Sequence, residues 1–104
     1  IIDNTWGTAL YFNALKFGID IVVEAITKYI GGHSDVMMGV TVCNNKYLNS
    51  INRWKRNSGQ CVGPDDIFLA LRGLRTLPLR LKQSQKNSIK LANFLSKQKE
   101  IKKV

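Results

Sequence analysis

The stretch IDIVVEAITKYIGGHSDV, residues 19–36, decides the fold class of this chain. It begins with Ile19 to Ile26, a β-rich run with three apolar β-branched side chains in a row, which predicts a strand buried on both faces. The paired glycines Gly31 and Gly32 then break the chain. A second apolar run, Val36 to Cys43, predicts a second strand.

The residues before this stretch predict a strand end and a short helix. Ile1 and Ile2 would be the end of a strand. Thr8 to Phe17 has apolar residues at helical spacing, which predicts one helix. Gly18 follows in the position of a C-cap glycine and would end that helix.

The residues after the second strand predict helices. Asn44 would cap a helix from Lys46 to Arg56, and Ser58 and Gly59 would end it. Pro64 and the two acids that follow it mark a new helix start, because proline suits the first turn and acids suit the positive end of the dipole. Pro78 is expected to interrupt that helix, and a long helix would then run from about Leu79 to Ser96. Strand, helix, two strands and then helices predict the α/β class.

The composition fits one small domain or a piece of a larger one. The chain has 104 residues, a net charge of +9 and a hydrophobic fraction of 44%. No apolar run reaches the roughly 18 residues that a membrane span needs, and the first residues lack the pattern of a signal peptide. One histidine and two cysteines do not complete a four-ligand zinc site, so no metal is predicted. We expect a cytoplasmic chain, and both ends look like cuts through a longer protein.

Three residues lie where chemistry could occur. Lys28 follows the first predicted strand, and ligands of open α/β sheets bind beyond the carboxyl ends of strands. A lysine there can be partly desolvated and offer its amine for Schiff-base chemistry, although a solvated loop lysine would look the same. Thr27 offers a hydroxyl for a phosphate, and Asp3, 25 residues upstream of Lys28, offers a carboxylate for a protonated ring nitrogen. Pyridoxal phosphate needs these three groups.

The amino-acid sequences of three motifs resemble those of a known family. DNTW at residues 3–6, TKY at 27–29 followed by GHSD at 32–35, and RGLRTL at 72–77 closely resemble the Cys/Met metabolism family of pyridoxal phosphate enzymes, the trans-sulfuration enzymes of fold type I. Trp6 and Ala25 resemble the bacterial cystathionine β-lyases within that family. The implied fold is an α/β fragment of the large cofactor-binding domain, with a mostly parallel sheet flanked by helices. Residues 1–104 would be its central part, with roughly 79–104 leading toward an absent C-terminal domain.

The resemblance also implies roles and a reaction. Lys28 would hold the cofactor and act as the general base, Asp3 would keep the ring nitrogen protonated, and Thr27 would donate to the phosphate. The parent enzyme would be a homotetrameric carbon–sulfur lyase that splits cystathionine to homocysteine, pyruvate and ammonia in methionine biosynthesis. Cystathionine γ-lyase or γ-synthase activity stays open as an alternative. The isolated chain is expected to be inactive, because the family's phosphate loop and carboxylate clamp lie in segments that it lacks.

Two features leave other interpretations open. Residues 82–104 carry seven lysines and one acid, so a basic helical module that binds nucleic acid or an acidic partner is the alternative function. We expect these lysines to scatter around the helix, which favours a solvated surface over nucleic-acid binding. Arg72 and Arg75 could bind an anion, or the helix that carries them could buttress the cofactor domain with its arginines paired to carboxylates; the buttress is favoured.

Overall fold

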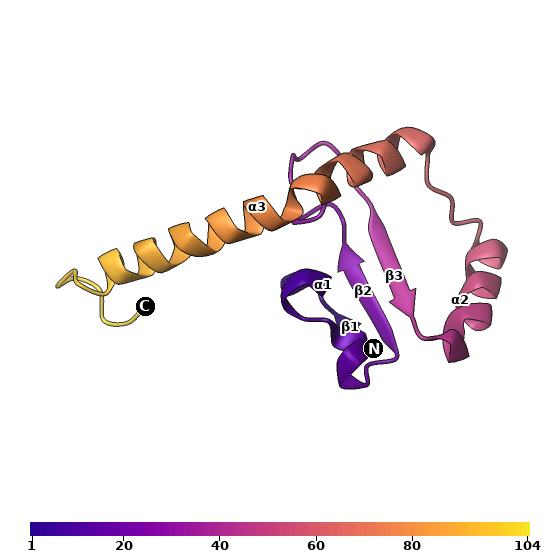
Figure 1. The fold of residues 1–104 in the computed structure, drawn as a ribbon, viewed down its shortest axis with the longest axis horizontal. Coiled ribbons are helices and arrows are strands. Elements are labelled where there is room, and N and C mark those ends of the chain that lie inside the picture. The colour runs from indigo at the N-terminus through magenta and orange to yellow at the C-terminus, as the bar shows by residue number, and fades with distance from the viewer.

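A computed structural model describes the whole chain, from Ile1 to Val104. Figure 1 shows a small sheet with helices on both sides of it and one long helix that runs across its end. In chain order, the elements are β1 (Ile2–Asp3), α1 (Thr8–Tyr11), the 3-10 helix η1 (Ala14–Phe17), β2 (Ile21–Ala25), β3 (Gly39–Cys43), α2 (Asn45–Ser58) and α3 (Pro64–Leu95). The predicted α/β class is confirmed.

The sheet has three strands in the order β1-β2-β3. β1 and β2 are parallel, with Ile2 opposite Val22. β2 and β3 are antiparallel, with Ala25 opposite Gly39. The sheet of this chain is therefore mixed, whereas the family resemblance implied a mostly parallel sheet for the cofactor-binding domain. The antiparallel pair forms because the loop of residues 26–38 turns the chain straight back onto β2.

Burial of β2 differs from the prediction of a strand covered on both faces. Val22 and Glu24 are buried, whereas Val23 between them is exposed, so the strand alternates between two environments. The buried face is covered by η1 and by the chain around Asn4. The main apolar cluster lies farther along, where Ile26 and Val36 meet α3. Only one face of the sheet is covered along β2 within this chain.

The helix predicted from Thr8 to Phe17 is wrong, because it is broken into α1 and η1. Phe12 is extended between the two pieces, with φ −137° and ψ 96°. The Asn4 side-chain amide donates to the Phe12 carbonyl at 2.9 Å, so a residue from outside the segment fixes the break. Gly18 ends η1 in the left-handed conformation, as predicted, with φ 82°.

The predicted cap of α2 is only half correct. Asn44 is the N-cap residue, but its side-chain amide donates to Asp20 Oδ1 at 2.6 Å instead of capping the helix. The helix ends as predicted, at Gly59 in the left-handed conformation, with φ 70°. No residue of α2 is buried.

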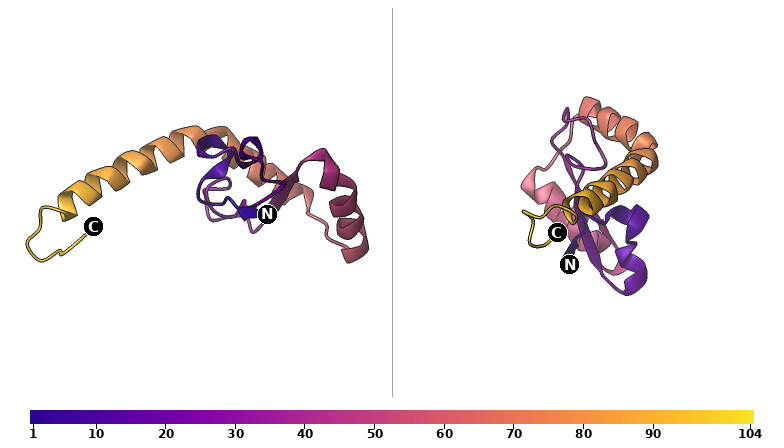
Figure 2. Two further views of the ribbon diagram at one scale, coloured as in Figure 1. Left: turned by 90° about the horizontal axis from the view of Figure 1, so that it is seen from below. Right: turned by 90° about the vertical axis from the view of Figure 1, so that its left-hand side faces the viewer.

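The predicted interruption at Pro78 is also wrong, because α3 continues for 32 residues through it. A proline inside a helix removes one hydrogen bond and costs about 3 kcal/mol. Burial of Gly73 and Leu77 before the proline, and of Leu81 after it, holds one helix across the site. Figures 1 and 2 show that the part of α3 beyond this region projects away from the strands. None of the helices combines the length and the apolar composition that a membrane span requires.

Candidate functional site

One cavity of about 1320 Å³ lies at the edge of the sheet where the parallel strands β1 and β2 end. It is lined by Asp3, Thr5, Trp6, Ala25, Thr27, Lys28, Tyr29, Gly32, Ser34, Asp35, Val36, Met37, Arg80 and Ser84. Asp3, Thr27 and Lys28, the three residues singled out from the sequence, are all in its wall. They meet there because neighbouring parallel strands bring their carboxyl ends to the same edge of a sheet.

Asp3 is held as a carboxylate by Thr5. The Thr5 hydroxyl, and the Thr5 amide N–H that donates to Asp3 Oδ1 at 2.9 Å, keep the pKa of Asp3 below its ordinary value. The Thr5 hydroxyl also accepts the Ala25 amide N–H at 2.8 Å, which ties the ends of β1 and β2 together. Asp3 is therefore ionised at neutral pH and exposed to the cavity.

Directly behind Asp3 lies a buried polar pair that the sequence reasoning missed. Asn4 is 4% exposed and Glu24 is 6% exposed, and the Asn4 side-chain amide donates to Glu24 Oε1 at 3.0 Å. Burial raises the pKa of Glu24, the Asn4 hydrogen bond opposes this, and the charge of Asp3 adds to the rise. The only signal in the sequence is Glu24 itself, an acid inside the β-rich run.

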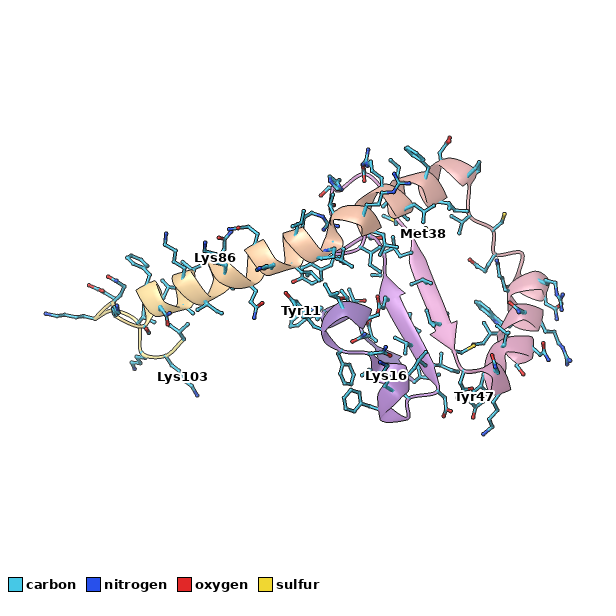
Figure 3. All side chains as sticks on the ribbon, viewed as in Figure 1. Tyr11, Lys16, Met38, Tyr47, Lys86 and Lys103 are labelled. Atoms are coloured by element: carbon cyan, nitrogen blue, oxygen red, sulfur yellow. The ribbon has the colours of Figure 1, made fainter.

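Thr27 closes the base of the loop that carries Lys28. Its amide N–H and its hydroxyl both donate to the Met38 carbonyl at 3.2 Å, and its hydroxyl accepts the Met38 amide N–H at 2.9 Å. Figure 3 shows Met38 where the loop enters β3, beside α3. The hydrogen bond from the Thr27 hydroxyl to the Met38 carbonyl is long for an O–H donor. If the hydroxyl turned away, the Met38 carbonyl would still accept the Thr27 amide N–H. The hydroxyl hydrogen is thus free to turn toward an acceptor in the cavity.

Lys28 lies in a tight turn that is closed by backbone hydrogen bonds. The Lys28 amide donates to the Ala25 carbonyl at 3.1 Å, and the Lys28 carbonyl accepts from Gly32 at 2.9 Å. Gly31 donates to the Ile26 carbonyl at 2.6 Å. The Lys28 side chain is exposed. The partial desolvation expected from its place after a strand is therefore absent in this chain.

The histidine of the loop supports the turn from outside the cavity. His33 Nδ1 donates to the Gly31 carbonyl at 2.7 Å, which requires the tautomer with its proton on Nδ1. His33 is not part of the cavity wall. Its contacts are those of a residue that shapes the loop.

The first half of α3 holds the loop from the other side. Arg72 forms an ion pair with Asp35, which matches the interpretation that the helix is a buttress with arginines paired to carboxylates. A Cβ on Gly73 would collide with the carbonyl oxygens of Ile30 and Gly31, so glycine is needed for this close approach. Arg75 is exposed and forms no ion pair or side-chain hydrogen bond.

Arg80 is a further cavity residue that the sequence reasoning missed. Its guanidinium binds backbone carbonyls of the Lys28 turn and lies against Gly32. Because its partners in the turn are backbone carbonyl oxygens 51 and 50 residues earlier in the chain, no side-chain motif could have indicated it.

The expected scatter of the C-terminal lysines is wrong for the part that is helical. Lys82, Lys86 and Lys90 follow one another at four-residue spacing in α3, so they share one face. Lys86 and Lys90 lie with Phe94 around one shallow surface groove. Figure 3 places Lys86 on the projecting part of α3, away from the strands.

The residues in the cavity suit pyridoxal phosphate. An ionised carboxylate, an amine and a hydroxyl converge on one space, and its volume exceeds the roughly 300–1,000 Å³ of common ligand pockets. The α/β fold and the groups in this cavity fit the class of pyridoxal phosphate-dependent enzymes. A sequence model of the Cys/Met metabolism PLP-dependent enzymes matches residues 1–104, and the chain belongs to this family.

Similar proteins with three different activities support this assignment. Cystathionine β-lyase of Haemophilus influenzae is 45% identical over 104 residues, which are 100% of this chain and 26% of that protein. Cystathionine γ-lyase of Lactobacillus plantarum superposes with a TM-score of 0.89 at 32% identity, over 94% of this chain and 26% of that one. Cystathionine γ-synthase of Xanthomonas oryzae pv. oryzae gives a TM-score of 0.77 at 41% identity, over 82% and 22%. The chain thus spans about a quarter of the length of these relatives.

Proposed function

We propose that this chain forms the pyridoxal phosphate site of a carbon–sulfur lyase, with Lys28, Asp3 and Thr27 as the residues that hold the cofactor. One observation carries the proposal. These three residues come from two strand ends that are far apart in the sequence, and they line a single cavity.

Each residue would have a separate task. When bound, pyridoxal phosphate supplies an aldehyde for amines and a ring that withdraws electrons from the substrate's α-carbon. Lys28 would bind the aldehyde through its amine and later take the proton from the substrate's α-carbon. Asp3, already ionised, would accept the ring N–H and keep it protonated. Thr27 would turn its hydroxyl from the Met38 carbonyl to the phosphate.

The particular reaction proposed is the β-lyase reaction, in which cystathionine and water give homocysteine, pyruvate and ammonia. The similarity to the Haemophilus influenzae enzyme supports it, and so do Trp6 and Ala25, which both line the cavity. The γ-lyase and γ-synthase reactions are the alternatives within the family, since enzymes with those activities superpose on this chain. A homotetrameric, cytoplasmic parent in methionine biosynthesis is part of the same proposal.

A titration with pyridoxal phosphate tests cofactor binding. The wild-type chain should give a saturable absorbance band near the visible edge, which Lys28→Ala abolishes and Asp3→Asn weakens. Lys90→Ala, on the projecting part of α3, is the matched control and should leave the band unchanged. A band of the same size in Lys28→Ala would contradict the proposal.

A turnover assay tests the expected inactivity of the chain alone. Lys28 is exposed, so water is not excluded from it in this chain. We expect no release of pyruvate from cystathionine. Release that Lys28→Ala abolishes would show that 104 residues are enough for catalysis.

A second candidate function, nucleic-acid binding, has one observation in its favour. Lys82, Lys86 and Lys90 share a face of α3, and Phe94 lies in the same groove as two of them. Titration of a labelled oligonucleotide at about 50 mM and at about 200 mM salt would test it. Binding that weakens steeply with salt and is lost in Lys86→Gln would support this candidate.

A further inference from the structure

Arg80 donates four hydrogen bonds, three of them to backbone carbonyl oxygens. Its Nη1 donates to the Tyr29 carbonyl at 2.6 Å, and its Nη2 donates to the carbonyls of Ile30 at 3.0 Å and Gly73 at 2.8 Å. Its Nε donates to Thr76 Oγ1 at 3.0 Å. These are four of the five N–H donors of a guanidinium, and no carboxylate pairs with it.

Two of the three carbonyls that Arg80 binds, those of Tyr29 and Ile30, belong to the turn that carries Lys28. Tyr29 and Ile30 follow Lys28 directly, and the Lys28 carbonyl is already bonded to the Gly32 amide. The side chain of Arg80 lies so close to Gly32 that a Cβ at that glycine would collide with it. One side chain therefore joins both sides of the turn to the buried half of α3.

We propose that Arg80 is the positioning residue of Lys28: it fixes the turn so that the Lys28 amine faces the cavity. A planar fork of donors can bind three carbonyls at once, which a lysine ammonium at the same position cannot do in this geometry. The inference rests on the proposed function for the role of Lys28, but the hold of Arg80 on the turn is independent of any cofactor.

The test compares Arg80→Lys and Arg80→Gln with Arg75→Lys and Arg75→Gln. Arg75 lies on the same helix, is exposed and forms no ion pair or side-chain hydrogen bond, so its variants control for charge and helix composition. The first readout is amide hydrogen exchange at Gly31 and Gly32 in the cofactor-free chain, with the amides of the β2–β3 ladder as the internal reference. The second is the share of pyridoxal phosphate that borohydride fixes on Lys28.

We expect roughly tenfold loss of amide protection at Gly31 and Gly32 in both Arg80 variants, as for the loss of hydrogen bonds from a charged donor. The share of label on Lys28 should fall in both, while the Arg75 variants match the wild type. Normal exchange in Arg80→Gln would overturn the inference. Wild-type exchange and labelling in Arg80→Lys would also overturn it. A positive charge without the forked donors would then be enough, as it would be if Arg80 were an anion ligand.

A measurement on the wild-type chain covers the case in which the variants fail to fold. In arginine-labelled protein, the guanidinium protons of Arg80 should exchange slowly and those of Arg75 quickly, and equal fast exchange would overturn the inference. Failure of the proposed function looks different. If wild-type label is absent from Lys28 while the Arg80 variants still lose protection at Gly31 and Gly32, Arg80 holds the turn and the cofactor role of Lys28 is wrong.

Discussion

The two halves of α3 are continuous in sequence but differ in what they contact. The half from Pro64 to Leu81 buries four residues, namely Ala70, Gly73, Leu77 and Leu81. The half from 82 to 95 buries none, and Figure 2 shows it extending away from the strands. Its apolar side chains, such as Leu91 at 57% exposed, meet solvent in this chain.

The difference shows that burial is concentrated in one part of the molecule. Only 12 of 104 residues are buried, and the radius of gyration is 17.3 Å against roughly 13 Å for a compact chain of this length. The buried half of α3 is the part that touches the Lys28 loop, through Arg72, Gly73 and Arg80. The parts that hold the candidate site are therefore also the parts that stabilise the fold.

Truncation of a leucine should give the largest difference in stability between the two halves of α3. Leu81→Ala removes a side chain that is 4% exposed and should lower the free energy of unfolding by about 3 kcal/mol. Leu91→Ala removes an exposed side chain from the other half and should cost under about 0.5 kcal/mol. Urea denaturation followed by circular dichroism measures both. Equal effects would mean that the two halves contribute alike.

Substitution by alanine at Gly73 and at Ser88 should give the second largest difference between the two halves of α3. Gly73→Ala places a Cβ against the backbone carbonyls of the Lys28 turn and should destabilise the chain by about 2 kcal/mol, despite the better helix propensity of alanine. Ser88→Ala puts the same residue on the exposed half and should be neutral or slightly stabilising. If Gly73→Ala stabilises the chain in the same denaturation assay, α3 does not pack closely on the loop.

The buried acid behind Asp3 should give a pH dependence. Because burial raises the pKa of Glu24, its stabilising contribution is fully present below the unfolded pKa, about 4.3, and is lost as the pH rises through the folded-state pKa. Glu24→Gln keeps an acceptor for Asn4 and should raise the free energy of unfolding at pH 7 by about 1 kcal/mol, with a flatter dependence in that window. Glu100→Gln, in the exposed tail, is the control and should change neither value. A less stable Glu24→Gln at pH 7 would contradict this reading of the pair.

The ion pair of the buried half should give the smallest effect. The side chains of Arg72 and Asp35 are 45% and 33% exposed, so Arg72→Ala should cost only about 0.5 kcal/mol. Added salt should shrink the difference, because exposed charges are screened. Arg75→Ala, which removes the same charge without an ion pair, should match the wild type in denaturation at low and high salt. A loss of several kcal/mol in Arg72→Ala would mean that the pair matters more than its exposure implies.

Local rules in the sequence predicted the parts of the fold that depend on neighbouring residues. The glycine ends at Gly18 and Gly59, the helix start at Pro64 and the β-rich run that forms β2 are all of this kind. Asp3, Thr27 and Lys28 were placed at strand ends by the same rules, and the structure brings them to one cavity.

The errors came from contacts between distant residues. The Asn4 side chain breaks the helix predicted from Thr8 to Phe17, and burial on both sides carries α3 through Pro78. The antiparallel partner of β2 depends on how a thirteen-residue loop, residues 26–38, turns back, which no local pattern encodes. Arg80 binds carbonyl oxygens, which every residue has, so its role could only be found in three dimensions.

Borohydride reduction of the wild-type chain with pyridoxal phosphate, followed by peptide mapping, tests the central claim most directly. The account predicts that the cofactor is fixed mainly on Lys28, and that Lys28→Ala loses this label without gaining it elsewhere. Label spread over the exposed lysines, and unchanged in Lys28→Ala, would contradict the claim that this cavity is a cofactor site.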